Sequence, residues 1–306
     1  MSLYFTVFLQ FLSLPILSHD SCGVLFHMLR TDNNSFLHGG AWRDVKQDKS
    51  EINPALEQLL SSTSSSSKHT LKHIAGIVSL NYGLSLYPPD DDSQDPSLRL
   101  VHPKHISDVV VALGYFQNKY NVGAKDENGN AIGHDYIIVG HSAGATLAFQ
   151  SWVQRCDCAT YRPPKAIVGL AGIYDLPAVV RNHSEIPFYR KMITGAFGPD
   201  ESTWVMASPV SDNYDEQWEA GGLDIAVLAA SEDDDLIETE QWRKMKALLE
   251  VQGWKMVDVD GEPVKKDGRQ RELVVLPLKG RHDEIWEKGD ELRRSIETVI
   301  ARLYPQ

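Results

Sequence analysis

A serine between glycines carries the most specific chemical signal in the sequence. Gly140-His141-Ser142-Ala143-Gly144 matches G-x-S-x-G, in which the glycines allow a tight turn that exposes the serine hydroxyl. The apolar run DYIIV precedes this turn and ATLAFQSWV follows it, which predicts a strand, a turn and a helix in that order. Ser142 is therefore the predicted nucleophile of an acyl-transfer reaction.

A serine hydroxyl is a weak nucleophile and needs a neighbouring general base. Of the eleven histidines, only His183 and His282 follow Ser142, as the chain order Ser, acid, His requires. His183 lies in the segment VVRNHSEIPF, which predicts a surface position. His282 follows the apolar run LVVLPL and is predicted to lie at a strand end, so it is the predicted base.

The acid that orients the base should lie between Ser142 and His282 in the chain. Its task is to hold the imidazole tautomer and to stabilise the imidazolium. The run AVLAASEDDDLI places four carboxylates just past an expected buried strand: Glu232, Asp233, Asp234 and Asp235. Their spacing does not choose among them, and Asp175, which also follows an expected strand, is a competitor.

An early glycine pair is the candidate oxyanion hole. Fixed N–H groups stabilise the charge that develops on the carbonyl oxygen, and in this arrangement one donor is the residue after the nucleophile, here Ala143. The other donors come from an early loop of His-Gly-Gly type. His38-Gly39-Gly40 fits, so the N–H groups of Gly39 and Gly40 are predicted to point into the site.

Alternating elements must position these residues. Strands are expected at HIAGIVSL, DYIIV, KAIVGL, LDIAVLAAS and RELVVLPL. Helices are expected at PALEQLL, KHISDVVVALGYFQNKY, EQWRKMKALLEVQG and DELRRSIETVIARLY, whereas SSTSSSSK is expected to be a loop. This alternation indicates one α/β domain with a mainly parallel sheet, helices on both faces and chemistry at the carboxyl ends of the strands.

Composition narrows the classes of partner. The net charge is −12 and no Lys/Arg-rich stretch occurs, which argues against nucleic acid. The three cysteines, Cys22, Cys156 and Cys158, form neither a disulfide framework nor a zinc pattern. We therefore expect no nucleic-acid partner and no metal bound by these cysteines, and a membrane partner is not expected.

Together, the motifs HGGAW, GHSAGA, GIYDL, SEDDDLI and RHDEIW resemble the fungal-type kynurenine formamidases (arylformamidases) of the α/β-hydrolase fold. The resemblance runs from about Leu37 to the C-terminus. It implies that Asp234 is the triad acid, because Asp234 is the Asp of a Ser-x-x-Asp-x-Leu pattern. It also implies a cytosolic enzyme that uses no metal and no cofactor and that hydrolyses a small-molecule substrate, N-formyl-L-kynurenine, to formate and L-kynurenine in tryptophan catabolism. His38 and Trp42 complete the motif, and Trp42 is a candidate wall for the aromatic leaving group or a brace for the loop.

The segment before the motif departs from this family. A member should have two or three strands before His38, but MLRTDNNSF is mostly polar, with only Phe36 and Leu37 apolar beside the motif. The chain opens with MSLYFTVFLQFLSLPILS, an uncharged run that suits a signal peptide or a short membrane span. We expect an uncharacteristic leader over residues 1–36, from a misassigned start, an intron or a splice variant, and a hydrolase domain over residues 37–306. The N-terminal strands are then missing or replaced, and the oxyanion loop has a weak anchor.

Two other functions stay open from the sequence. A carboxylesterase for short acyl esters would use the same triad, and it would be secreted if the opening run acts as a signal peptide. The third alternative is a non-catalytic homologue that binds a small ligand or a partner. The intact Ser142, Asp234 and His282 argue against it, whereas the uncharacteristic leader keeps it open. The sequence also leaves open whether the protein is a monomer or a homodimer.

Overall fold

A parallel sheet forms the centre of the molecule. The computed structural model describes residues 33–86, 95–122, 133–153, 162–215, 223–259, 261, 265–266 and 269–305. A seven-stranded sheet has the order β2-β1-β3-β4-β5-β9-β6, with every neighbouring pair parallel. Its strands are β1 (Asn33–Leu37), β2 (Gly76–Leu80), β3 (Tyr136–His141), β4 (Ala166–Leu170), β5 (Ile225–Ser231), β6 (Lys255–Val257) and β9 (Glu272–Leu278). A separate antiparallel pair joins β7 (Lys265–Lys266) to β8 (Arg269–Gln270).

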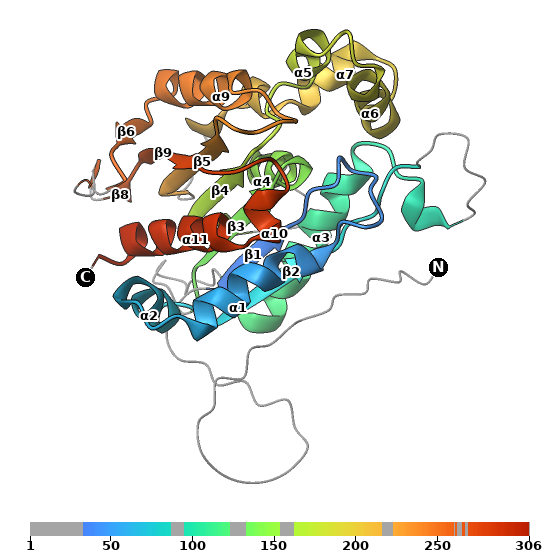
Figure 1. Cartoon of the computed structure of the whole chain (residues 1–306). Coiled ribbons are helices and arrows are strands. Elements are labelled where there is room, and N and C mark those ends of the chain that lie inside the picture. The colour runs from blue at the N-terminus through green and yellow to red at the C-terminus, as the bar shows by residue number, and fades with distance from the viewer. Residues whose placement is uncertain are drawn as a thin grey trace.

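Helices cover both faces of the sheet, as predicted (Figure 1). One face carries α1 (Asn53–Ser61), α2 (Ser65–Lys72), α10 (Glu284–Glu287) and α11 (Asp290–Leu303). The other carries α3 (Lys104–Tyr120), α4 (Ala143–Val153) and α9 (Glu240–Val251). Successive strand residues point to opposite faces. Ile137 and Ile138 accordingly lie in two different hydrophobic cores, one on each side of the sheet.

The strand that leads into the HGGAW motif lies inside the sheet, between β2 and β3. Phe36 and Leu37 are fully buried in opposite cores, and the Ser35 hydroxyl donates to the Ile137 carbonyl at 3.2 Å. The expectation of a poor strand and a weak anchor is wrong, because one apolar side chain on each face and pairing on both sides are enough to hold this short strand. The expected domain boundary at Leu37 falls within β1, and the apolar run at residues 1–18 lies outside the described residues.

The serine-rich run, expected to be a loop, contributes helix α2. The Ser64 hydroxyl caps the helix by accepting from the Ser67 N–H at 3.1 Å. The Ser67 hydroxyl is buried and donates to Glu297 of α11 at 2.5 Å. Serine is a mediocre helix former, so composition misled the prediction. The cap and the contact with α11 supply the stability that propensity does not.

Three helices between β4 and β5 form a group of their own: α5 (Leu176–Asn182), α6 (Pro187–Phe197) and α7 (Glu201–Ala207). Figure 1 shows them together at one end of the molecule. Short 3-10 helices complete the described elements: η1 (Lys49–Ile52), η2 (Pro96–Leu98) and η3 (Pro209–Ser211). Among the described helices, none is long and apolar enough to cross a membrane. All three cysteines lie outside the described ranges.

Candidate active site

Ser142 lies on the sharp turn between β3 and α4, where the motif predicted it. Its φ of 52° falls in the left-handed region, which residues with a side chain rarely adopt. The Ser142 N–H donates to the Leu170 carbonyl at 2.9 Å, which helps to hold the turn. Close packing explains the glycines on either side. A Cβ on Gly140 would lie 2.3 Å from the Gly144 oxygen, and a Cβ on Gly144 would lie 2.1 Å from the Leu37 oxygen. The turn therefore packs directly against the end of β1.

The imidazole ring of His282 forms a buried hydrogen bond with the carboxylate of Asp234. The His282 Nδ1 atom lies 2.9 Å from Oδ2 and 3.1 Å from Oδ1 of Asp234, and the two side chains are 4% and 3% exposed. The same carboxylate accepts from the N–H groups of Leu236 and Ile237, each at 2.9 Å, which fixes its orientation. An imidazole that donates from Nδ1 keeps Nε2 as the atom that can accept a proton.

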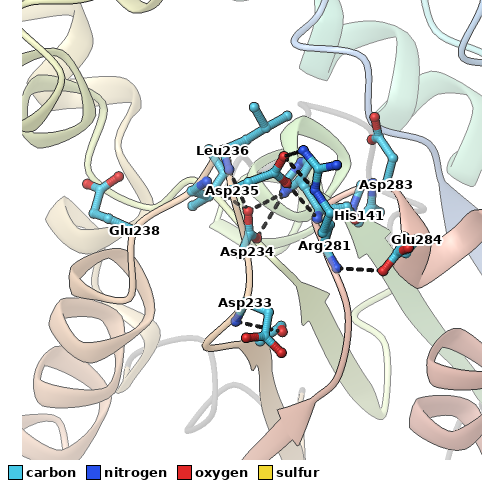
Figure 2. A network of polar contacts seen from close by, with 12 residues as sticks. His141, Asp233, Asp234, Asp235, Leu236, Glu238, Arg281, Asp283 and Glu284 are labelled. Carbon is cyan, nitrogen blue, oxygen red and sulfur yellow. Dashed lines mark hydrogen bonds and ion pairs between the residues drawn. The ribbon is translucent and has the colours of Figure 1, made fainter.

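The neighbouring Asp235 holds the loop after β9 that carries Arg281 and His282. The sequence patterns did not predict this role for Asp235. Its carboxylate accepts from the His282 N–H at 3.2 Å and from the Arg281 guanidinium, with Nε at 3.0 Å. Figure 2 shows both aspartates reaching from the loop after β5 toward the loop that carries Arg281. The hydrogen bond from His282 and the Arg281 ion pair lower the pKa of Asp235. Two successive acids therefore hold the same histidine: Asp234 binds the His282 ring, and Asp235 binds the His282 backbone.

The rival residues are engaged elsewhere. Asp175 caps α5 by accepting from the Ala178 N–H at 2.9 Å, and it forms an ion pair with Lys244 at 2.9 Å. His183 pairs with Glu238 at 2.8 Å. Glu232 and Asp233 are exposed to solvent. Of the candidate acids, only Asp234 contacts the imidazole ring of His282, whereas Asp235 contacts the backbone N–H of the same residue.

Ser142 and His282 line the same cavity. Within the described part of the chain, no hydrogen bond joins the Ser142 hydroxyl to the His282 ring. Such contacts are often loose in a free enzyme and tighten when substrate binds. His141 lies beside them with its ring centroid 4.7 Å from that of His282, and burial lowers its pKa well below the ordinary value, so this ring stays neutral. Ser142 and His282 therefore share one cavity, and Asp234 contacts the His282 ring without lining that cavity.

The expectation that Gly39 is an oxyanion donor is wrong. The Gly39 N–H donates to Oε2 of Glu51 at 3.2 Å, away from the cavity. The cavity is lined by Gly40 and Ala41 but not by Gly39. Gly39 instead packs against the His141 ring, because a Cβ there would lie 2.8 Å from Nδ1. This glycine provides space and a hydrogen bond to Glu51, a residue that the motif does not include.

Gly40 and Ala143 remain as the candidate oxyanion donors. The Tyr82 hydroxyl donates to the Gly39 carbonyl at 2.8 Å. In a trans peptide the N–H points opposite to the carbonyl, so the Gly40 N–H is directed away from Tyr82 and toward the cavity that Gly40 lines. Ala143 is the first residue of α4, where backbone N–H groups have no partner within the helix. Neither N–H is bonded to another described residue.

Trp42 braces the HGGAW loop. The alternative prediction, that Trp42 forms a wall for the substrate, is wrong. The side chain is fully buried, packs edge-on against Phe197 at 4.9 Å between ring centroids and does not line the cavity. Its carbonyl accepts from the Ser85 N–H at 2.7 Å. Ala41 and Trp42 have φ values of 50° and 58°, a strained conformation that needs support from its surroundings.

His38 lies in the core beneath the loop. Its ring stacks on Tyr82 with 4.4 Å between centroids, and the side chain does not reach the cavity. Burial lowers the pKa of His38 to about 4, so the ring is neutral near pH 7. His38 therefore packs beneath the loop and does not contact the cavity in which substrate would bind.

The cavity over Ser142 has a volume of about 460 Å³, within the usual range for sites that bind small molecules. Its apolar lining comes from α6 and from the segments after β4 and β5: Ile173, Phe188, Tyr189, Met192, Leu236 and Ile237. Charged side chains of both signs also line it: Arg43, Asp44, Lys46 and Asp283. The Arg43 guanidinium lies 4.6 Å from the centre of the Phe188 ring. In the described ranges, no cluster of three or more His, Cys, Asp or Glu side chains could hold a metal.

Two fungal proteins are similar to this chain over most of its length, although no family model matches it. A kynurenine formamidase-like hydrolase of Fusarium equiseti is 33% identical over 276 residues, which cover 88% of this chain and 82% of the relative. A kynurenine formamidase of Aspergillus versicolor is 32% identical over 274 residues, which cover 83% of this chain and 84% of the relative.

Solved esterase structures share the architecture. Carboxyl esterase 2 of Tuber melanosporum aligns with a TM-score of 0.58 at 15% identity, over 88% of this chain and 75% of its own. An esterase of Pyrobaculum calidifontis aligns with a TM-score of 0.57 at 17% identity, over 90% of this chain and 77% of its own. At these identities the likeness establishes the fold alone, which is that of the α/β-hydrolases.

Proposed function

The chain belongs to the kynurenine formamidase family of α/β-hydrolases, and we propose that it hydrolyses N-formyl-L-kynurenine to formate and L-kynurenine. The observation that carries the proposal is the buried contact between His282 and Asp234 beside Ser142, at a cavity with an apolar lining. The kynurenine formamidases among its relatives supply the substrate class.

Acylation uses the three residues in turn. The Ser142 Oγ attacks the formyl carbon while Nε2 of His282 takes the hydroxyl proton. Asp234 stabilises the imidazolium that forms, and the N–H groups of Gly40 and Ala143 bind the oxyanion. His282 then donates its proton to the arylamine nitrogen, which breaks the C–N bond and leaves a formyl ester on Ser142.

Deacylation repeats the proton transfers with water as the nucleophile. His282 takes a proton from water, which attacks the formyl carbon. Collapse of the second tetrahedral intermediate returns the proton to Ser142 and releases formate. A formyl group carries only hydrogen on its acyl side, so almost the whole cavity is available to the aromatic amine.

The cavity lining suits a leaving group that is an aromatic amino acid. The apolar side chains of α6 can cover the aryl ring. The Arg43 and Lys46 side chains are placed to attract an α-carboxylate, because guanidinium and ammonium groups bind carboxylates through charge-assisted hydrogen bonds. Asp44 and Asp283 give the same cavity groups that attract an α-ammonium.

A carboxylesterase is the second candidate function, favoured by the fold shared with the two esterases. A comparison of N-formyl-L-kynurenine with p-nitrophenyl acetate separates the candidates, with Ser142→Ala as the control. We expect kcat/KM to be higher for the formamide. Cleavage of the ester alone would establish an esterase, and a folded protein that cleaves neither would be a non-catalytic homologue.

A further inference from the structure

Glu51 is a buried carboxyl group that the triad mechanism does not use. It lies on η1 and is 3% exposed. Its Oε2 accepts from the Gly39 N–H at 3.2 Å, whereas its Oε1 is buried without a hydrogen-bond partner. No cation pairs with Glu51 among the described residues. A buried carboxyl without a cation is costly to keep in a fold, so its contact with the HGGAW loop calls for an explanation.

The surroundings of Glu51 favour its neutral form. Burial is the largest cause, and the carboxylates of Asp283, Asp48 and Asp44 add to it, so that the pKa of Glu51 is raised to about 8. A neutral carboxyl group can be held in the core at a smaller cost than a carboxylate. Its carbonyl-type oxygen still accepts a hydrogen bond from a backbone N–H.

Glu51 and Tyr82 together hold two consecutive peptide units. The Tyr82 hydroxyl donates to the His38 carbonyl at 3.1 Å and to the Gly39 carbonyl at 2.8 Å, while Glu51 accepts from the Gly39 N–H. Gly39 has no Cβ to restrict its backbone, so external contacts must fix its dihedral angles. Rotation about Gly39 would also turn the next peptide unit, which carries the Gly40 N–H.

We propose that Glu51 is a positioning residue that, with Tyr82, locks Gly39 so that the Gly40 N–H stays directed at the oxyanion. The inference rests on the proposed hydrolysis through Ser142. It assigns to the first glycine of the motif the role of an anchored hinge, and to the second glycine the role of donor. The contact comes from η1, outside the motif itself.

Kinetics of two variants test the contact. Glu51→Ala removes the acceptor, whereas Glu51→Gln keeps an oxygen of the same reach. We expect Glu51→Ala to lower kcat by about tenfold to a hundredfold with KM changed less than about twofold, because loss of a whole oxyanion donor costs about a hundredfold or more. Glu51→Gln should stay within about threefold of the wild type, because the amide oxygen can still accept from a backbone N–H.

Affinity for a tetrahedral adduct separates positioning from general stability. Phenylboronic acid forms such an adduct on a serine hydroxyl and places an oxygen where the oxyanion would lie. We expect Glu51→Ala to weaken its Kd by the same factor as kcat while the Kd of L-kynurenine is unchanged, with Ser142→Ala as the negative control. Equal losses for both ligands, a Glu51→Gln variant as impaired as Glu51→Ala, or a folded Glu51→Ala variant with full activity would each overturn the proposal.

Tyr82→Phe provides a second route if Glu51→Ala does not fold. It removes the other hydrogen bond to Gly39, so the same split between boronate and product affinity is expected, and its absence would contradict the proposal.

The proposed function and the proposed role of Glu51 can fail separately. A wild type that cleaves neither N-formyl-L-kynurenine nor p-nitrophenyl acetate would refute the proposed function, whereas the boronate comparison would still decide on the role of Glu51.

Discussion

The His282 ring donates to the Asp234 carboxylate at 2.9 Å, and each side chain is less than one-twentieth exposed. This contact distinguishes Asp234 from the other acids in the run after β5. If it orients the base, Asp234→Asn should lower kcat by about a thousandfold or more at nearly unchanged KM, because the amide stabilises the wrong tautomer. Steady-state kinetics on N-formyl-L-kynurenine checks this.

The matched control is Asp233→Asn, which changes an exposed neighbour in the same run. It should retain activity close to that of the wild type. Comparable losses in the two variants would show that the run acts through its total charge, and the assignment of Asp234 would then be lost.

Trp42 should act on stability rather than on substrate affinity. It is fully buried against Phe197 and away from the cavity. Trp42→Ala should lower the free energy of unfolding by about 3–5 kcal/mol, as for other large buried aromatic residues. Trp42→Phe should leave KM for N-formyl-L-kynurenine unchanged. Denaturant titration and kinetics measure the two quantities, and a selective rise in KM with unchanged stability would restore the wall role.

Arg43 should contribute to the binding of the substrate's carboxylate. Arg43→Met is expected to raise KM for N-formyl-L-kynurenine by about tenfold or more, since hydrogen bonds to charged groups contribute about 1.5–3 kcal/mol. KM for p-nitrophenyl acetate, which has no carboxylate, should not change. Lys68→Met, at an exposed position on α2, is the control. An equal rise for both substrates would assign Arg43 to the packing of the cavity instead.

Glu51 should also make stability depend on pH. Its pKa is about 8 in the folded protein, against 4.5 for an ordinary glutamate, so between these values the folded state holds a proton that the unfolded state releases. The folded state therefore loses stability as pH rises through this interval. Glu51→Gln does not titrate, so its Tm relative to the wild type should rise between about pH 5 and about pH 9. The carboxylates of Asp44, Asp48 and Asp283 and the hydroxyl of Tyr82 face this group in both proteins. A Tm difference that is constant over this range would contradict the raised pKa.

Short sequence patterns correctly predicted the parts of the site that neighbouring residues determine. The turn at Ser142 is encoded by glycines two residues away on each side, and the position of His282 follows from the apolar strand before it. Asp234 could be chosen among its neighbours only through the family resemblance, because the choice depends on which carboxylate the His282 loop approaches.

The oxyanion loop was harder to predict because distant residues orient it. The direction of the Gly39 N–H depends on Glu51, twelve positions further on, and the direction of its carbonyl depends on Tyr82, forty-three positions away. The role of Trp42 likewise depends on Phe197, on a helix that the sequence pattern did not predict. Polarity alone could not show that NNSFL pairs on both sides as β1.

Cleavage of the formamide by the proposed mechanism depends on Ser142 as the nucleophile. The most direct measurement follows the release of L-kynurenine and formate from N-formyl-L-kynurenine by the purified wild type and by Ser142→Ala, with circular dichroism confirming that both are folded. We expect the wild type to release the two products in equal amounts and the variant to react at the uncatalysed background rate. Hydrolysis by Ser142→Ala at a rate near that of the wild type would contradict this mechanism.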